Sequence, residues 1–584
     1  MYEKFSIKNI RLRLTQSESL PKLTLMALVT GLLSGSFLIL FEELLFFFDA
    51  VFQRALISEH IFSPLARFLL PVGGALALIL LIKSCPPKRR SFGIAHVIER
   101  LTLNRGWLPI KSTLVQFGGI LIALVSGFSV GREGPAVHMG AGAGSFLGQI
   151  LKLPINMLGV LAGCGTAAAI AALFNTPVAG VIFAMEVVMK EYSLESFIPV
   201  MTSAVMASVL TQTVYGLSPV FLIPIIPSAT PEELMVTAVT AIIIGLLAAA
   251  FIQINVFAIQ KRQNKVVVPL LIAGLLMGVV AVLVPATMGI GYEMIEALLI
   301  GDGLNLQFLF ILLATKLVIT ALVIGLGVPG GMIGPSLMMG ATAGACSALL
   351  AEQFLGIPAS NTTFHVMIGM ITMMAAIFQA PFTALITMLE LTYSSQIVFP
   401  AMLAIVIACL TASQLCKQQG IFAMQFLARG LDVPLSPIAQ FLNRIGVTSL
   451  MDSRFLSVPP AISMDKAKAV ICETTQWLVI KKESQFYILN TVVLFDDEIA
   501  PGTSALGSLN SQILQRVGLI NSKATAYEAL TMMKSSNLES LLVVSGEENE
   551  EAAFFPEKSG IINKAMIDKL FDSSGNFADK NAID

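Results

Sequence analysis

Two glycine-rich stretches of the sequence combine residue types that could hold an anion. The first begins as Gly131-Arg132-Glu133-Gly134-Pro135, and the run at 331–344 repeats eight of the fourteen positions of the run at 131–144. Glycine lets the backbone approach an ion closely, and proline fits the first turn of a helix. Each stretch therefore predicts an extended loop that enters a helix, whose free N–H groups and dipole attract negative charge.

The residue Glu133 places a carboxylate in the first of these loops. A carboxylate beside free N–H groups can occupy the place of the anion and block it, and protonation would release it. Because ionisable groups inside membrane segments are usually functional, we expect Glu133 to be a gate. The alternatives are that Glu133 only caps its helix or pairs with Arg132.

The repeat continues beyond the two glycine-rich stretches. Pro177 and Glu186 return 204 residues later as Pro381 and Glu390. The two related halves, about 22–215 and 232–416, are each interrupted by Gly and Pro at the same place. This arrangement is typical of transporters whose sites lie near the bilayer midplane, where broken half-helices of inverted repeats meet.

The composition indicates a multi-pass membrane protein. Of the 584 residues, 55% are hydrophobic and 12% are charged, and apolar runs long enough to span a bilayer recur from about 22 to 416. The net charge of −1 argues against a nucleic-acid partner. The basic residues of segment 1–21, and those at 83–90 after the second run, predict a cytoplasmic N-terminus by the positive-inside rule.

The C-terminal part differs in character from the rest of the chain. Residues 437–584 are charged, and short β-prone runs (477–480 and 541–544) alternate with helical stretches (464–472 and 526–536). This pattern, which occurs twice, predicts a cytoplasmic α/β domain. The six cysteines form no Cys-x-x-Cys pair, and no catalytic triad or metal-ligand cluster is evident, so we expect neither an enzyme nor a cofactor.

These motifs together resemble the CLC family of chloride channels and chloride/proton exchangers over about 22–430. The stretch 131–135 matches the signature of that family, 330–335 resembles its second-half loop, and 179–186 resembles a helix on the cytoplasmic side of its ion path. The resemblance implies an all-α membrane fold with inverted repeats and broken half-helices. It also implies a homodimer with one chloride path per subunit, in a bacterial-like inner (plasma) membrane with both termini cytoplasmic.

The resemblance also assigns residues to the anion site. It implies Glu133 as the gating glutamate, flanking backbone at Gly131, Arg132 and Gly134, and anion-binding N–H groups at Met332 and Ile333. Phe92 and Phe422 stand where the family has a serine and a tyrosine hydroxyl, so both hydroxyls are missing. Since a hydrogen bond to a charged group is worth about 1.5–3 kcal/mol, we expect weak central binding and poor discrimination among anions.

The position after Glu186 bears on the transport mechanism. The exchangers of the family carry a proton-passing glutamate there, and this chain has Val187, as channel members do. Val187 therefore favours a passive, voltage- or pH-gated chloride channel, with Glu186 as a neighbouring proton-path candidate. The alternative is a proton-coupled chloride antiporter with a rerouted proton path. A CBS-regulated transporter of another ion is a remote alternative, since it would need clustered carboxylates within the spans. Pro135 argues against the fluoride exporters of the family.

Three further features are less specific. The tail resembles a degenerate CBS pair, but Asn563 and Met566 stand where nucleotide-binding members carry Ser or Thr and then Asp, which argues against nucleotide binding. His138 follows the gate motif and could tune its pH response, although a structural role is expected for His96 and His138. Lys316 lies inside an apolar run and is expected to be a structural counter-charge.

Overall fold

The computed structural model describes most of the chain. The described residues are 20–57, 64–86, 92–104, 106–153, 155–216, 221, 230–262, 265–302, 305–356, 362–392, 394–431, 442, 445–472, 475–482, 485–495, 506, 514–522, 524–544 and 559–573. The basic N-terminal residues before 20, the basic run at 88–90 and most of the link between the halves lie outside these ranges. The contacts divide the chain into two units, Met1–Val433 and Pro434–Asp584.

The first unit is helical. Its first half contains α2 (Leu20–Ile57), α3 (Pro64–Lys83), α4 (Gly93–Leu103), α5 (Ile110–Val125), α6 (Glu133–Ile150), α7 (Ile155–Phe174), α8 (Pro177–Phe183), the π-helical turn η3 (Ala184–Met189) and α9 (Leu194–Tyr215). Its second half contains α10 (Pro231–Arg262), α11 (Val267–Leu283), η4 (Pro285–Thr287), α12 (Tyr292–Leu299), α13 (Leu306–Leu326), α14 (Ile333–Leu355), α15 (Thr362–Phe378), α16 (Pro381–Thr392), η6 (Ser395–Ile397), α17 (Val398–Leu410), η7 (Thr411–Leu415) and α18 (Ile421–Ala428).

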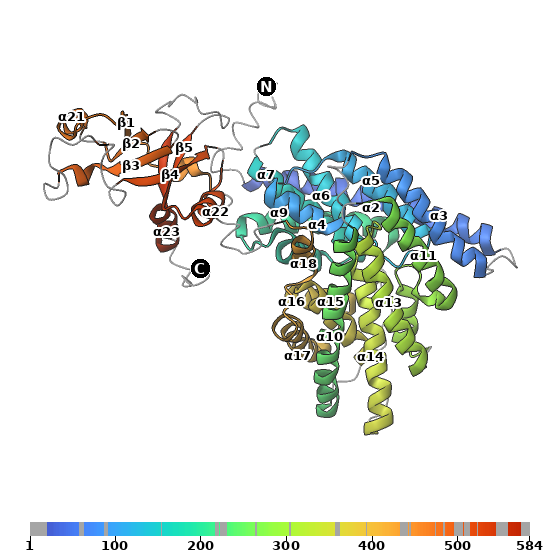
Figure 1. The fold of residues 1–584 in the computed structure, drawn as a ribbon. Coiled ribbons are helices and arrows are strands. Elements are labelled where there is room, and N and C mark those ends of the chain that lie inside the picture. The colour runs from blue at the N-terminus through green and yellow to red at the C-terminus, as the bar shows by residue number, and fades with distance from the viewer. Residues whose placement is uncertain are drawn as a thin grey trace. The chain divides into compact units, whose positions relative to one another are not determined.

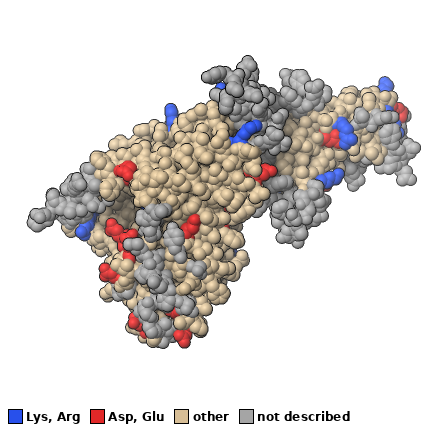
Figure 2. Space-filling model, turned by 180° about the vertical axis from the view of Figure 1, so that it is seen from behind, with Lys and Arg blue, Asp and Glu red and all other residues tan. Residues whose placement is uncertain are grey.

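The helices of this unit have the length and composition of membrane helices. Within the described residues, eight are long and apolar enough to cross a bilayer, and several apolar helices are shorter, at 10–17 residues. Figure 2 shows one face of the molecule, on which charged side chains are sparse over the helical unit. The helix α4 has only 11 residues and is too short to span a bilayer.

Local signals explain where individual helices begin. Pro231 stands at the start of α10, where Thr230 and Glu233 form a reciprocal cap. The Thr230 N–H donates to Glu233 Oε2 at 2.7 Å, and the Glu233 N–H donates to Thr230 Oγ1 at 3.3 Å. Asn305 accepts from the Phe308 N–H at the start of α13.

Close glycine contacts pack equivalent helix pairs in the two halves. A Cβ on Gly140 of α6 would lie 2.1 Å from the Gly165 carbonyl oxygen of α7, and one on Gly340 of α14 would lie 2.2 Å from the Gly369 oxygen of α15. Both pairs therefore depend on glycine, which lets membrane helices approach closely. Figure 1 shows α13 and α14 of the second half running side by side.

The second unit is an α/β domain with one six-stranded sheet in the order β1-β2-β3-β4-β5-β6. Its elements are α20 (Val447–Leu450), β1 (Phe455–Val458), α21 (Met464–Val470), β2 (Trp477–Lys482), β3 (Gln485–Asn490), η8 (Thr491–Phe495), β4 (Gln515–Asn521), α22 (Ala526–Ser536), β5 (Ser540–Val544), β6 (Gly560–Asn563) and α23 (Lys564–Ser573). The expected strands and helices of the tail are all present.

The sheet contains the same strand arrangement twice. β1 and β4 each pair in parallel with the next strand, and β2 and β5 each pair antiparallel with the strand after that. Asp452, which precedes β1, exchanges backbone hydrogen bonds with Ile561 of β6, so the segment before β1 is bonded to the last strand of the sheet. Hydrogen bonds from Arg454 hold the pKa of Asp452 below its ordinary value, against the opposing effect of burial.

Candidate functional site

The two glycine-rich loops meet each other directly. Gly131 and Gly331 form an antiparallel bridge, in which the Gly131 N–H donates to the Gly331 oxygen at 2.8 Å and the Gly331 N–H donates to the Gly131 oxygen at 2.6 Å. A Cβ on Gly331 would lie 2.5 Å from the Gly134 nitrogen, so only glycine allows this approach. The repeat in the sequence thus becomes a physical contact between the halves. The N–H of Gly131 donates to Gly331 in this bridge, whereas we expected this N–H to face an anion.

The carboxylate of Glu133 lies between the two loops. Glu133 is the first residue of α6 and is fully buried. A Cβ on Gly131 would lie 2.1 Å from Glu133 Oε2, and one on Gly334 would lie 2.7 Å from Glu133 Oε1, so glycines of both loops leave room for it. Oε2 has no hydrogen-bond partner among the described residues. A buried, half-satisfied carboxylate beside helix starts is suited to move when it gains a proton.

The residue Tyr292 holds the other carboxylate oxygen. The hydroxyl of Tyr292, the first residue of α12, donates to Glu133 Oε1 at 2.8 Å. The ring of Phe221 packs edge-on against the Tyr292 ring, with the centroids 5.6 Å apart. Sequence reasoning missed Tyr292, although the segment Gly289-Ile290-Gly291-Tyr292 signals a tight turn; both glycines have positive φ.

The residue Lys316 fixes the turn that carries Tyr292. Lys316 is buried in α13, and its Nζ donates to the carbonyl oxygens of Thr287 at 3.0 Å and Gly289 at 2.8 Å. The expected structural role is therefore seen, but the partners are carbonyl oxygens and not a counter-charge. Since a buried ammonium is costly without acceptors, these bonds hold the turn in place.

The side chain of Arg132 does not pair with Glu133. Its Nη1 donates to both carboxylate oxygens of Glu42 in α2, at 2.6 and 2.8 Å, and its guanidinium lies 5.5 Å from the centre of the Tyr292 ring. The pairing of Glu42 with Arg132 joins residues 90 positions apart and could not be read from the sequence. The guanidinium is thereby neutralised locally, and Glu133 is left to the two loops and Tyr292.

Three helices begin near this point. α6 begins at Glu133 and α14 at Ile333, with Met332 as its N-cap residue, so the N–H groups of Met332 and Ile333 have no acceptor within the helix. α4 begins at Gly93, and a Cβ added to Gly93 would lie 4.0 Å from the Gly330 oxygen of the second loop. The converging helix starts favour negative charge.

The two phenylalanines expected to replace hydroxyls lie at helix starts. Phe92 is the N-cap residue of α4 and is half-buried, and Phe422 is the second residue of α18 and is buried. The rings of Phe422 and Phe378 are 5.5 Å apart. α4 and α18 contact each other. Phenylalanine brings no hydrogen-bond donor, so an anion here depends on backbone N–H groups.

The glutamates of the second repeated motif cap each other's helices. Glu186, in η3, accepts from the N–H of Phe382 at 3.2 Å and of Thr383 at 2.6 Å, at the start of α16. Glu390 of α16 accepts from the N–H of Val178 at 3.0 Å and of Ala179 at 2.6 Å, at the start of α8. The neighbouring Val187 is buried. The exchange of caps between the halves gives Glu186 a structural function.

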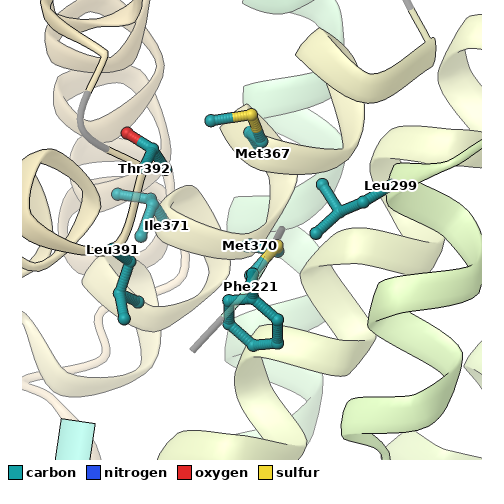
Figure 3. A pocket seen from close by; sticks show the side chains of 7 residues that line it. All are labelled: Phe221, Leu299, Met367, Met370, Ile371, Leu391 and Thr392. Atoms are coloured by element: carbon teal, nitrogen blue, oxygen red, sulfur yellow. The ribbon is translucent and has the colours of Figure 1, made fainter. Parts of the chain in front are cut away.

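A pocket near Tyr292 is apolar and unsuited to an anion. Figure 3 shows its lining side chains, which come from α12, α15 and α16 together with Phe221 of the link between the halves: Phe221, Leu299, Met367, Met370, Ile371, Leu391 and Thr392. The hydroxyl of Thr392 is bonded to the Met388 carbonyl oxygen at 2.7 Å. This pocket is therefore not a candidate anion site, and the two loops remain the candidate.

The fold and the paired loops define a membrane protein of the CLC type, and comparisons agree. The family model described as voltage gated chloride channel matches residues 73–413. The chain belongs to this family of chloride-transporting membrane proteins, so its function is anion transport across a membrane and not enzymatic catalysis.

Individual relatives differ in the activity for which they are named. A ClcB-like protein of Ralstonia nicotianae, named for a chloride channel, is 30% identical over 358 residues, which cover 59% of this chain and 82% of the relative. The H⁺/Cl⁻ exchange transporter ClcA of Salmonella arizonae is 27% identical over 431 residues, which cover 70% and 88%. The crystal structure of a eukaryotic CLC transporter has a TM-score of 0.63 at 15% identity and covers 93% of this chain and 97% of its own.

Proposed function

We propose that this chain exchanges chloride for protons across a bacterial-like inner membrane, with Glu133 as the gate. The observation that carries the proposal is the position of the Glu133 carboxylate, buried between the two bridged loops. There it lies where helix starts would attract an anion, so carboxylate and chloride compete for one place.

The proposed cycle follows from this competition. The ionised carboxylate occupies the site and excludes chloride. A proton removes its charge, the bond from Tyr292 weakens, and the side chain leaves the site to an anion. The N–H groups of Met332 and Ile333 then hold chloride, with backbone at Arg132 and Gly134 completing the loop. Because Phe92 and Phe422 add no hydroxyl, we expect weak binding and poor discrimination among anions.

Exchange is preferred to the passive channel that Val187 suggests. Relatives that align over most of their length are named as H⁺/Cl⁻ exchange transporters, which supports coupling. Val187 cannot carry a proton, and the carboxylate of Glu186 is engaged as a helix cap. Exchange therefore requires that protons reach Glu133 by another route. A passive, voltage- or pH-gated channel remains the second candidate, since Val187 specifically favours it.

The proposal is tested with purified protein in liposomes, by recording chloride efflux and proton movement together. Exchange predicts that a chloride gradient drives protons uphill, and that Glu133→Gln abolishes proton movement and makes chloride flux independent of pH. Glu352→Gln, at an exposed position of α14, is the matched control and should behave as the wild type. Chloride flux without proton movement in the wild-type protein would favour the channel.

The remaining parts of the proposal concern assembly and topology. We expect a homodimer with both termini cytoplasmic, with segment 1–21 and the domain at 437–584 on the same side of the membrane. The repeated strand arrangement of the tail supports a CBS-like pair that stabilises the dimer or couples to the gate. Nucleotide binding is not expected, because Asn563 and Met566 replace the residues that such binding needs.

A further inference from the structure

Two buried histidines lie beside each other on helices that begin at the anion site. His96 of α4 and His138 of α6 are 1% and 0% exposed, and their ring centroids are 5.3 Å apart. None of their four ring nitrogens has a hydrogen-bond partner among the described residues. Buried polar atoms are usually satisfied, so two adjacent unsatisfied imidazoles mark a site with a purpose beyond packing.

The residue Glu99 extends the two histidines into a row of three titratable groups that leads toward the surface. His96 Nδ1 lies 3.6 Å from Glu99 Oε2, one turn further along α4, and the Glu99 side chain is 19% exposed. Oε2 of Glu99 also has no hydrogen-bond partner among the described residues. Three titratable groups thus lead from the buried interior to a position that water can reach.

The inner end of the row lies close to the gate in the chain. His138 follows Glu133 by five residues on α6, which corresponds to about 7.5 Å along the helix axis. α4 itself begins at Gly93, against the second loop. The two side chains also differ by about 140° around the helix, so water molecules, and not direct contact, would have to join them.

We propose that Glu99, His96 and His138 form a proton relay between the cytoplasmic side and Glu133. The inference rests on the proposed exchange function and supplies the route that Val187 cannot. A proton from water binds the Glu99 carboxylate and passes to one ring nitrogen of His96, which releases a proton from its other nitrogen toward His138. His138 passes a proton through water to Glu133 in the same way. Each step moves one proton between lone pairs, and no electrons are transferred.

The surroundings of the row suit a relay. Burial opposes the ionised form of Glu99, whereas the neighbouring His96 and then the charges of Arg100 and Arg429 favour it. In η3, which packs on α4, Glu186 is turned away toward α16, and Lys190 and Glu191 follow the end of η3. In α5, which packs on α6, the charged residue Lys111 is exposed, and the buried polar residues are uncharged. These include Thr113, whose Oγ1 faces Gly142, and the buried amide of Gln116.

The relay is tested by the ratio of protons to chloride moved by full-length protein in liposomes. His96→Gln, His138→Gln and Glu99→Gln should each lower this ratio at least about tenfold while chloride efflux persists, because the relay acts as an acid–base chain. Glu99→Asp, which keeps a carboxylate, should retain coupling. His365→Gln, at a buried histidine of α15, is the control and should keep the wild-type ratio.

The outcomes separate the relay from the exchange function. A coupled wild-type protein whose three glutamine variants all keep the wild-type ratio would overturn the relay and leave exchange intact. A wild-type protein that moves no protons would overturn exchange and the relay with it. A histidine variant that moves no chloride is taken as misfolded. In that case the variant Glu99→Gln, at a partly exposed position, decides whether the relay exists.

Discussion

The hydroxyl of Tyr292 should set how firmly the gate is closed. Tyr292→Phe removes the donor that lies 2.8 Å from Glu133 Oε1 and keeps the ring that packs on Phe221. A hydrogen bond to a charged group contributes about 1.5–3 kcal/mol. Under the proposed competition between chloride and the carboxylate for one place, this loss should lower the apparent Kd for chloride by about ten- to hundredfold.

The assay is calorimetric titration of chloride into purified protein at alkaline pH, since raising the pH favours the ionised carboxylate. Tyr215→Phe is the matched control. It also removes a hydroxyl bonded to a glutamate, Glu43 Oε1 at 3.0 Å, but at an exposed position. The control should bind chloride as the wild type does.

A double-mutant cycle tests the reasoning further. In a Glu133→Gln background the carboxylate is absent, so adding Tyr292→Phe should change chloride affinity little. Equal effects of Tyr292→Phe with and without the carboxylate would refute the competition. So would an unchanged Kd in a well-folded single mutant.

Four other substitutions test the loops, the caps and the tail. Gly331→Ala places a methyl group against the backbone of the other loop and should impair transport and cost about 1–3 kcal/mol of stability, whereas Gly73→Ala, with nothing within 4 Å, should be neutral in thermal unfolding. Glu186→Gln and Glu390→Gln should each weaken a cap by about 0.5–2 kcal/mol and lower the melting temperature similarly; a lowered proton-to-chloride ratio in the first alone would make Glu186 a proton carrier. Because the pKa of Asp452 is lowered in the folded tail, its ionised carboxylate stabilises the fold. This stabilisation is complete above the ordinary pKa of about 3.9 and is lost as the pH falls toward the pKa of the folded state. Asp452→Asn should therefore flatten the acid dependence of tail unfolding, followed by tryptophan fluorescence.

The repeated residue types made much of the architecture predictable. The pairs Gly131/Gly331 and Glu186/Glu390 occur in the same order in both halves, so the internal repeat could be predicted from the sequence. The strands of the tail followed from β-branched runs between helical stretches. In each case the information lies in neighbouring residues.

The hydrogen-bond partners within the site could not be predicted in this way. The sequence indicated free N–H groups at both loops, but the Gly131 N–H is bonded to Gly331. Glu186 was a proton-path candidate, and its position at the start of α16 depends on how the two halves pack.

By itself, the sequence determined a membrane fold of two related halves and singled out Glu133 as the candidate gate, because helix length, glycine spacing and a charge in an apolar run are local properties. Tertiary structure alone decided the partners of that carboxylate. Tyr292 lies 159 residues from Glu133, and Glu42 lies 90 residues from Arg132. Contacts across such separations depend on the packing of whole helices, which no short pattern of residues specifies.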